Sequence, residues 1–193
     1  MKKLFLLLLA ALCGFVPLFA DDVADVKAVI VKEWELIAKG DFVGVLPLLT
    51  KDYRGLGKFD YEQTRWMFLG FDGKHLEEFV LFTAVAYKNG AKLTPEELEK
   101  CRADARAMLS DPTTVKAYEA EAKKYSAMMR EWAAFTLKYH KFIRIRIKGD
   151  SADVGVIHES KPGETPRRSQ PLVIFLRRDN GVWRICGEVE ASF

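Results

Sequence analysis

The strongest constraint on the fold is a change in hydrophobic period near His140. Before this residue, apolar side chains recur every three or four positions, as in Val26, Ile30 and Trp34, which is the spacing of one face of an α-helix. After it, the segment 142–148 alternates between apolar and basic residues, the two-residue period of a strand with one buried face. The sequence therefore predicts an α+β fold, with helices before residue 140 and a sheet after it.

Local signals mark the ends of the helices. Gly40 follows the first apolar stripe, Thr94-Pro95-Glu96-Glu97 has the form of a capping box, and Asp111-Pro112 opens a long helix that ends near Tyr139. The apolar stripe of this long helix fits a core-facing position better than the seam of a dimeric coiled coil, because it is wider than two heptad positions. The other expected helices cover 23–39, with Asp22 as its cap, 42–49, 60–69 and 75–88.

The last third of the chain is predicted to be an antiparallel meander. Four strands are expected at 142–148, 152–159, 172–176 and 182–190, with a tight hairpin at Asp179-Asn180-Gly181 and a polar loop over 160–167. A short glycine-containing strand is expected over 51–57. Simple alternation in the final strand places Glu188 and Glu190 on the polar face, opposite Trp183, Ile185 and Val189.

The first 20 residues predict export. Lys2 and Lys3 precede an apolar run that ends at Ala20, so residues 1–20 have the pattern of a secretory signal peptide, with an uncleaved anchor as the alternative. Residues 21–193 would then be a single domain in the periplasm or outside the cell, with membrane contact only for export. Cys101 and Cys186 could pair in that oxidising compartment, although two buried free thiols are expected in preference.

Two separated stretches resemble a known family. The segment Leu36–Tyr53, and Gly149–Val154 together with Arg178–Ile185, resemble the cone-shaped α+β proteins that include nuclear transport factor two, ketosteroid isomerase, scytalone dehydratase and SnoaL-like cyclases. The resemblance implies a cystatin-like cone, in which N-terminal helices pack on a strongly curved antiparallel sheet around an apolar cavity. Residues 74–140 would be a helical insertion in that pattern. The resemblance also implies a possible homodimer through the outer face of the sheet.

The search for chemical motifs excludes several function classes. The chain has no H-E-x-x-H, C-x-x-C pair, phosphate loop or G-x-S-x-G, and its three histidines are far apart, so no metal and no cofactor are expected. The formal net charge of +3 is too small to favour nucleic acid, whose binding depends on neutralising phosphates.

The expected function is therefore an exported binding module without a catalytic site, which holds an apolar small molecule or a protein partner. The candidate pocket residues are Tyr53, Trp66, Phe68 and His158. The alternative is a cofactor-free isomerase, dehydratase or cyclase with His158, Tyr53 or Asp52 as its acid or base. An apolar cavity with a buried ionisable side chain at its floor would favour the enzyme, and a filled interior would favour a scaffold.

Overall fold

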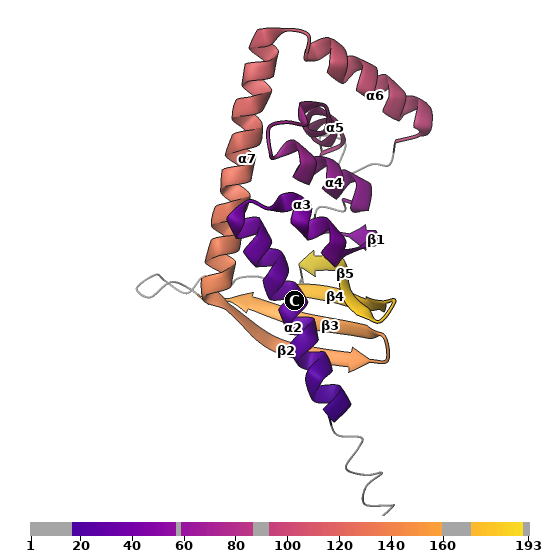
Figure 1. Cartoon of the computed structure of the whole chain (residues 1–193), viewed down its shortest axis with the longest axis vertical. Helices are drawn as coiled ribbons and strands as arrows, with labels where there is room; N and C mark the ends of the chain where they lie inside the picture. The colour runs from indigo at the N-terminus through magenta and orange to yellow at the C-terminus, as the bar shows by residue number, and fades with distance from the viewer. Residues whose placement is uncertain (1–16, 57–58, 87–92, 160–170, 191–193) are drawn as a thin grey trace, which may run out of the picture.

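The computed structural model describes residues 17–56, 59–86, 93–159 and 171–190 (Figure 1). Within these ranges the chain forms six α-helices, one 3-10 helix and a five-stranded sheet, so the predicted α+β class is confirmed. The elements in chain order are α2 (Pro17–Lys39), α3 (Phe42–Val45), the 3-10 helix η1 (Leu46–Leu48), β1 (Leu49–Arg54), α4 (Tyr61–Gly70), α5 (Leu76–Ala86), α6 (Pro95–Met108), α7 (Pro112–Tyr139), β2 (His140–Lys148), β3 (Ser151–His158), β4 (Leu172–Asp179) and β5 (Val182–Glu190).

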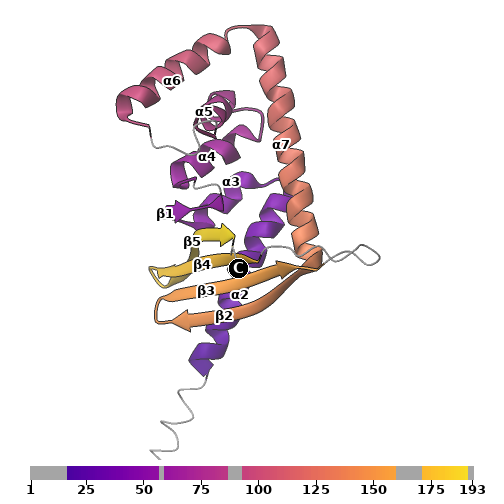
Figure 2. The same cartoon turned by 180° about the vertical axis from the view of Figure 1, so that it is seen from behind.

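The sheet has the order β1-β5-β4-β3-β2 (Figure 2). Strands β2 to β5 form the predicted antiparallel meander, and the β4–β5 hairpin turns through Asn180 and Gly181, which both have positive φ. Strand β1 pairs with β5 in parallel, so the sheet is mixed rather than wholly antiparallel. This correction has a topological reason, since β1 is far from β5 in sequence and local alternation carries no information about its neighbour.

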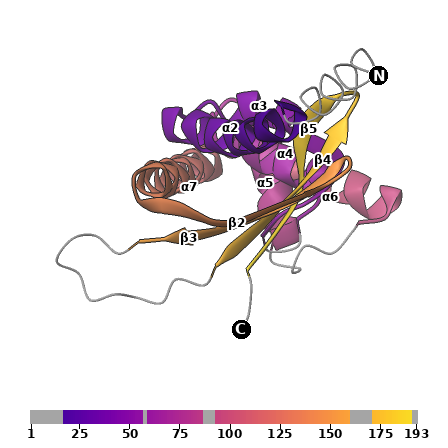
Figure 3. The same ribbon diagram turned by 90° about the horizontal axis from the view of Figure 1, so that it is seen from below.

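The expectation of a strongly curved sheet is wrong, because the sheet is not strongly curled. Helix α2 lies on one face of it with α7 beside α2 (Figure 3), and the C-terminal end of α7 reaches the sheet at His158. Helices α3, α4 and α5 stack beyond the β1 edge (Figure 1). Helices thus close the apolar interior, and the sheet does not have to wrap around it. The residues between 74 and 140 supply much of this covering as α5, α6 and α7.

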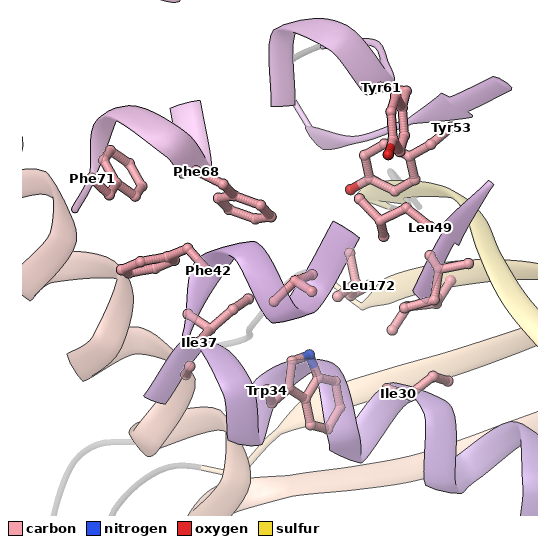
Figure 4. Packing of buried hydrophobic residues seen from close by; sticks show 14 of the residues in the cluster. Ile30, Trp34, Ile37, Phe42, Leu49, Tyr53, Tyr61, Phe68, Phe71 and Leu172 are labelled. Carbon is pink, nitrogen blue, oxygen red and sulfur yellow. The ribbon is translucent and has the colours of Figure 1, made fainter. Parts of the chain in front are cut away.

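The core is built on the apolar stripe of α2. Val26, Ile30, Trp34 and Ile37 are at most 3% exposed, and they belong to the same buried cluster as the inner side chains of the sheet (Figure 4). Burial of each such side chain stabilises the fold by about 1.5–3 kcal/mol. Asp22 lies inside α2 and does not cap it; its carboxylate accepts hydrogen bonds from the Arg178 guanidinium and from Trp183 Nε1, which ties the helix to the sheet.

The predicted helix starts at Thr94 and Asp111 are confirmed. The Thr94 hydroxyl accepts from the Glu97 amide and the Glu97 carboxylate accepts from the Thr94 amide, while Asp111 caps α7 through the amides of Thr113 and Thr114. Helix α7 packs on α2 and α5, so its stripe faces the core as expected. The helix predicted over 42–49 ends early: α3 passes into η1 at Leu46, and Leu49 begins β1. The next residue, Pro47, lacks the amide that a helix interior needs.

Several predictions concern segments outside the described residues, among them most of the signal peptide and the loop over 160–167. In the part that is described, no helix combines the length and the apolar character needed to cross a membrane. Cys101 and Cys186 are both free, as the sequence favoured, but they are partly rather than fully buried.

Candidate functional site

A cavity of about 360 Å³ lies where α2, α4 and α7 meet the ends of β1 and β5. This volume is at the small end of the range found for small-molecule pockets, about 300–1,000 Å³. The residues that line it come from five elements and the segment after β1: Glu33, Ile37, Tyr53, Gly55, Leu56, Phe59, Thr64, Met67, Phe68, Met128, Met129, Trp132 and Glu188.

The cavity walls are mainly apolar and adaptable. Three methionines, Met67, Met128 and Met129, contribute flexible thioether side chains that can adjust to the shape of a ligand. Met128 is 53% exposed and Leu56 is 37% exposed, so both border the opening to solvent. The arrangement suits a small apolar molecule that enters past these two residues.

Glu33 is the least expected member of the lining. It lies on α2 beside Trp34, is only 5% exposed, and its Oε2 atom is buried without a hydrogen-bond partner. Burial raises the pKa of the Glu33 carboxyl well above its ordinary value, and the nearby carboxyl of Glu188 raises it further. An uncompensated buried carboxyl is costly, so Glu33 is the polar group that most needs a partner from outside the chain.

Glu188 reaches the cavity because β5 contains a β-bulge. Leu176 pairs with Ile185 and Phe175 pairs with Gly187, which leaves Cys186 as an extra residue in β5. One extra residue moves every following side chain to the opposite face of the sheet. Glu188 therefore lies opposite the fully buried Ile174, and the prediction that it faces solvent is wrong.

The Glu188 carboxyl has a pKa near neutrality. Its enclosure by the protein raises the pKa from an ordinary 4.5 to about 7. Two carboxyls in one apolar cavity repel each other when both are ionised, so the pair holds a proton more readily than either group would alone in water. Such a pair can accept hydrogen bonds, donate one, or transfer a proton.

Tyr53 adds a phenol to the same cavity from β1. It is 6% exposed, and burial raises its pKa, with further contributions from Glu188 and Glu33, so the hydroxyl stays protonated. The ring folds back over Gly55, where an added Cβ atom would lie 2.6 Å from the Tyr53 hydroxyl oxygen. Gly55 thus makes room for the phenol, which is the physical reason for a glycine at this position.

The structure brings together two of the four candidate pocket residues. Tyr53 and Phe68 line the cavity, and Phe68 packs with Phe42 and Phe71 on the opposite side of the cluster from Tyr53 and Tyr61 (Figure 4). Trp66 points away from it and borders a separate surface depression near Arg102.

The two other acid or base candidates also lie outside the cavity. His158 does face the apolar side of β3, but its Nε2 is 3.0 Å from Thr136 Oγ1 and its ring lies against Trp132, which separates it from the cavity. Burial, and then His140, lower its pKa. Asp52 is 61% exposed and accepts two hydrogen bonds from Arg177, which lower its pKa to about 2.

Sequence reasoning missed both Glu33 and Glu188, although each had a signal. Glu33 is seven residues after Val26 and three after Ile30, so it lies on the apolar stripe of its helix. Gly187 inside a strand is a common mark of a β-bulge, which would have reversed the assignment of Glu188. No group of three or more His, Cys, Asp or Glu side chains in the described ranges is placed to hold a metal ion.

Comparisons with known proteins give distant structural likenesses. No family model matches the chain, and no curated protein sequence matches it. A de novo designed protein with a curved β-sheet is 19% identical with a TM-score of 0.22, over 33% of this chain and 60% of the designed one. An NTF2-like protein with a cystatin-like fold from Novosphingobium aromaticivorans is 13% identical with a TM-score of 0.36, over 93% of this chain and 84% of its own. The chain is thus distantly similar in structure to an NTF2-like protein.

Proposed function

We propose that this protein binds a small, mostly apolar molecule in the cavity between α2, α4, α7 and the sheet. The observation that carries the proposal is an apolar cavity of about 360 Å³ that the protein's own side chains leave unfilled. Protein interiors are close-packed, and spaces larger than a water molecule are few in a domain of this size. A retained apolar space with an opening is therefore best explained by a ligand.

The methionines provide a test with a built-in control. In full-length protein with methyl-labelled methionine, addition of hexanol should shift the methyl resonances of Met67, Met128 and Met129, which line the cavity. Met108 lies on α6 outside the lining and should not shift. Equal shifts at all four residues would mean non-specific binding, and the absence of any shift would contradict the proposal.

A paired substitution sharpens this test. Met128→Trp places a large side chain at the opening and should weaken hexanol binding by about tenfold or more, while Met108→Trp on exposed α6 should leave it unchanged. Both positions are exposed, so neither change should alter the free energy of unfolding by more than about 0.5 kcal/mol. Retained affinity in Met128→Trp would place the ligand elsewhere.

A second candidate function is a cofactor-free enzyme that transfers a proton, such as an isomerase, dehydratase or cyclase. Two carboxyls in the cavity favour it: Glu33 is buried, and the partly buried Glu188 has a pKa of about 7. Acid–base catalysis works best when the pKa lies near the working pH. The test measures how fast the protein exchanges the hydrogens beside the carbonyl of cyclohexanone in deuterium oxide. The exchange should be lost in Glu188→Gln and kept in Glu190→Gln; no exchange above the buffer rate would leave binding as the function.

Export and self-association remain proposals alongside this function. If residues 1–20 act as a signal peptide, protein recovered from the periplasm or medium should begin at Asp21, and an intact Met1 there would contradict cleavage.

On the outer face of the sheet, Ile143, Phe175 and Val189 are 39–49% exposed. A homodimer through this face would be excluded by a monomeric mass in solution.

A further inference from the structure

We propose that the ligand is a protonated primary or secondary amine, whose ammonium group lies between Glu33 and Glu188 and whose apolar body lies against the methionines. This inference rests on the proposed binding function and names its ligand class. It begins from the charges that face the cavity. Carboxyls enter from α2 and β5, and none of the described lining residues is Lys, Arg or His.

Among the described residues, the cavity lining thus contains acid groups and no cation. Buried carboxyl groups in proteins are almost always paired with a positive charge or a set of hydrogen-bond donors, because burial of an isolated charge is costly. The described residues supply neither to Glu33 Oε2, which is buried with no hydrogen-bond partner. An organic cation in the cavity would supply the missing charge.

The unsatisfied oxygen also indicates which kind of cation fits. A protonated amine carries both a positive charge and N–H donors, so it can satisfy Glu33 Oε2 directly. A quaternary ammonium carries the charge without a donor, and an alcohol carries a donor without the charge. The amine is therefore the ligand class that meets both requirements.

The rest of the lining suits an amine with an apolar body. The aromatic rings of Tyr53, Phe59, Phe68 and Trp132 face the same cavity, and a cation close to such rings gains a further electrostatic attraction. Met67, Met128, Met129 and Leu56 provide the apolar wall and the opening. The small volume limits the body to a short chain or a single ring.

Binding should release protons. Among the described residues, the titratable groups that line the cavity are Glu33 from α2, Glu188 from β5 and Tyr53 from β1. The described lining residues of α4, of α7 and of the segment after β1 carry none. Burial raises the pKa of both carboxyls, so the empty cavity holds protons that an ammonium group would displace. Affinity for an amine should therefore increase as the pH rises through about 7.

The experiment uses three probes on the full-length protein: hexylamine, hexanol and hexyltrimethylammonium. Calorimetric titration at about pH 8 should show that hexylamine binds at least about tenfold more tightly than hexanol or hexyltrimethylammonium. Proton release should appear as a binding heat that depends on the buffer. At about pH 5 the advantage over hexanol should largely disappear. Shifts of the three cavity methionine methyl groups locate the binding site.

Matched variants assign the effect to the carboxyl pair. Glu33→Gln and Glu188→Gln should each reduce hexylamine affinity toward that of hexanol and leave hexanol binding unchanged, which also shows that the variants are folded. The controls are Glu35→Gln on α2 and Glu190→Gln on β5. Each removes one carboxylate charge outside the cavity lining and should leave the hexylamine affinity unchanged.

The outcomes separate this inference from the function on which it rests. If hexanol shifts the cavity methionines and hexylamine binds no better, the amine proposal is wrong and the binding function stands. If hexyltrimethylammonium binds as tightly as hexylamine, the N–H donor is not required and the assignment to primary or secondary amines is overturned. If no probe shifts the cavity methionines, both proposals fail.

Discussion

The carboxyls inside the cavity and those on the surface have opposite pKa shifts. Inside, burial raises the pKa of Glu33 and Glu188, and the described lining supplies no cation. On the surface, arginine side chains lower the pKa of Asp52 and of Glu77. The chemical group is the same, so the difference is due to the partners that the fold provides.

The surface carboxylates hold parts of the fold together. Glu77 on α5 accepts hydrogen bonds of 3.1–3.2 Å from Arg102 and Arg106 of α6, and Asp153 on β3 accepts from Arg146 of β2 at 3.0 and 3.1 Å. Within the described ranges, no hydrogen bond or ion pair joins the Glu33 or Glu188 side chain to another element. A group that costs stability and links no elements is more readily explained by ligand recognition or chemistry than by folding.

The largest expected effect concerns Glu188. Its pKa is about 7 when folded and near 4.5 when unfolded, so the folded state holds a proton that the unfolded chain loses. The free energy of unfolding should therefore fall as the pH rises from about 4.5 to about 7, by on the order of 2–3 kcal/mol. Glu188→Gln should reduce this slope, leaving the part that the raised pKa of Glu33 contributes, and should be the more stable protein at about pH 8. Urea unfolding across this pH range measures both effects.

Glu190→Gln is the matched control for that experiment, because Glu190 is exposed on the same strand. It should keep the slope of the wild-type protein. An unchanged slope in Glu188→Gln would mean that the Glu188 carboxyl is not enclosed when the protein is folded. The opposite pKa shifts of the cavity and surface carboxyls would then be wrong.

A smaller effect is expected from Gly55→Ala, which alters the position of Tyr53 in the cavity. The new Cβ would lie 2.6 Å from the Tyr53 hydroxyl oxygen and force the ring to move. We expect a loss of about 1–2 kcal/mol in the free energy of unfolding. The loss should be smaller in a Tyr53→Phe background, because the closest atom is then absent. Strictly additive effects in a double-mutant cycle would argue against this contact.

On the surface, Asp153→Asn should destabilise the protein by at most about 1 kcal/mol. Asp153 pairs with Arg144 at 3.2 Å and with Arg146 at 3.0 Å, but both arginines are at least half exposed. The effect should shrink in about 1 M salt, which screens such pairs. Thermal or urea unfolding at low and high salt would show this, and a salt-independent loss would point to packing instead.

The smallest effect is expected from Asp52→Asn, which should change the free energy of unfolding by about 0.5 kcal/mol or less at neutral pH because the pair with Arg177 is exposed. Hydrogen bonds, from Arg177 first and then from Thr50, lower the pKa of Asp52 from 3.8 to about 2. Its small contribution is therefore present above about pH 4 and lost as the pH falls toward about 2, the opposite direction to Glu188. Acid unfolding of the variant and the wild type measures it; a loss that appears only above pH 7 would contradict this assignment.

The sequence was most informative where the signal is local. The capping residues Thr94 and Asp111, the hairpin at Asn180-Gly181 and the change of period at His140 were all read from neighbours a few residues apart, and the structure confirms each. Candidate site residues were harder to predict. Of the four proposed, Tyr53 and Phe68 line the cavity, while the two carboxyls that give the cavity its chemistry were not among them.

The amino-acid sequence by itself determined the helices, the strands and their order, because helix caps, turn residues and hydrophobic period act within one element. Tertiary structure decided the parallel pairing of β1 with β5, the extra residue at Cys186 and the placement of Glu33 and Glu188 in one apolar cavity. The parallel pairing and the shared cavity depend on which distant segments meet, and the extra residue depends on how β5 pairs with β4. The pKa of a carboxyl and its partners are set by neighbours from other parts of the fold, and the sequence of one helix or strand does not contain those neighbours.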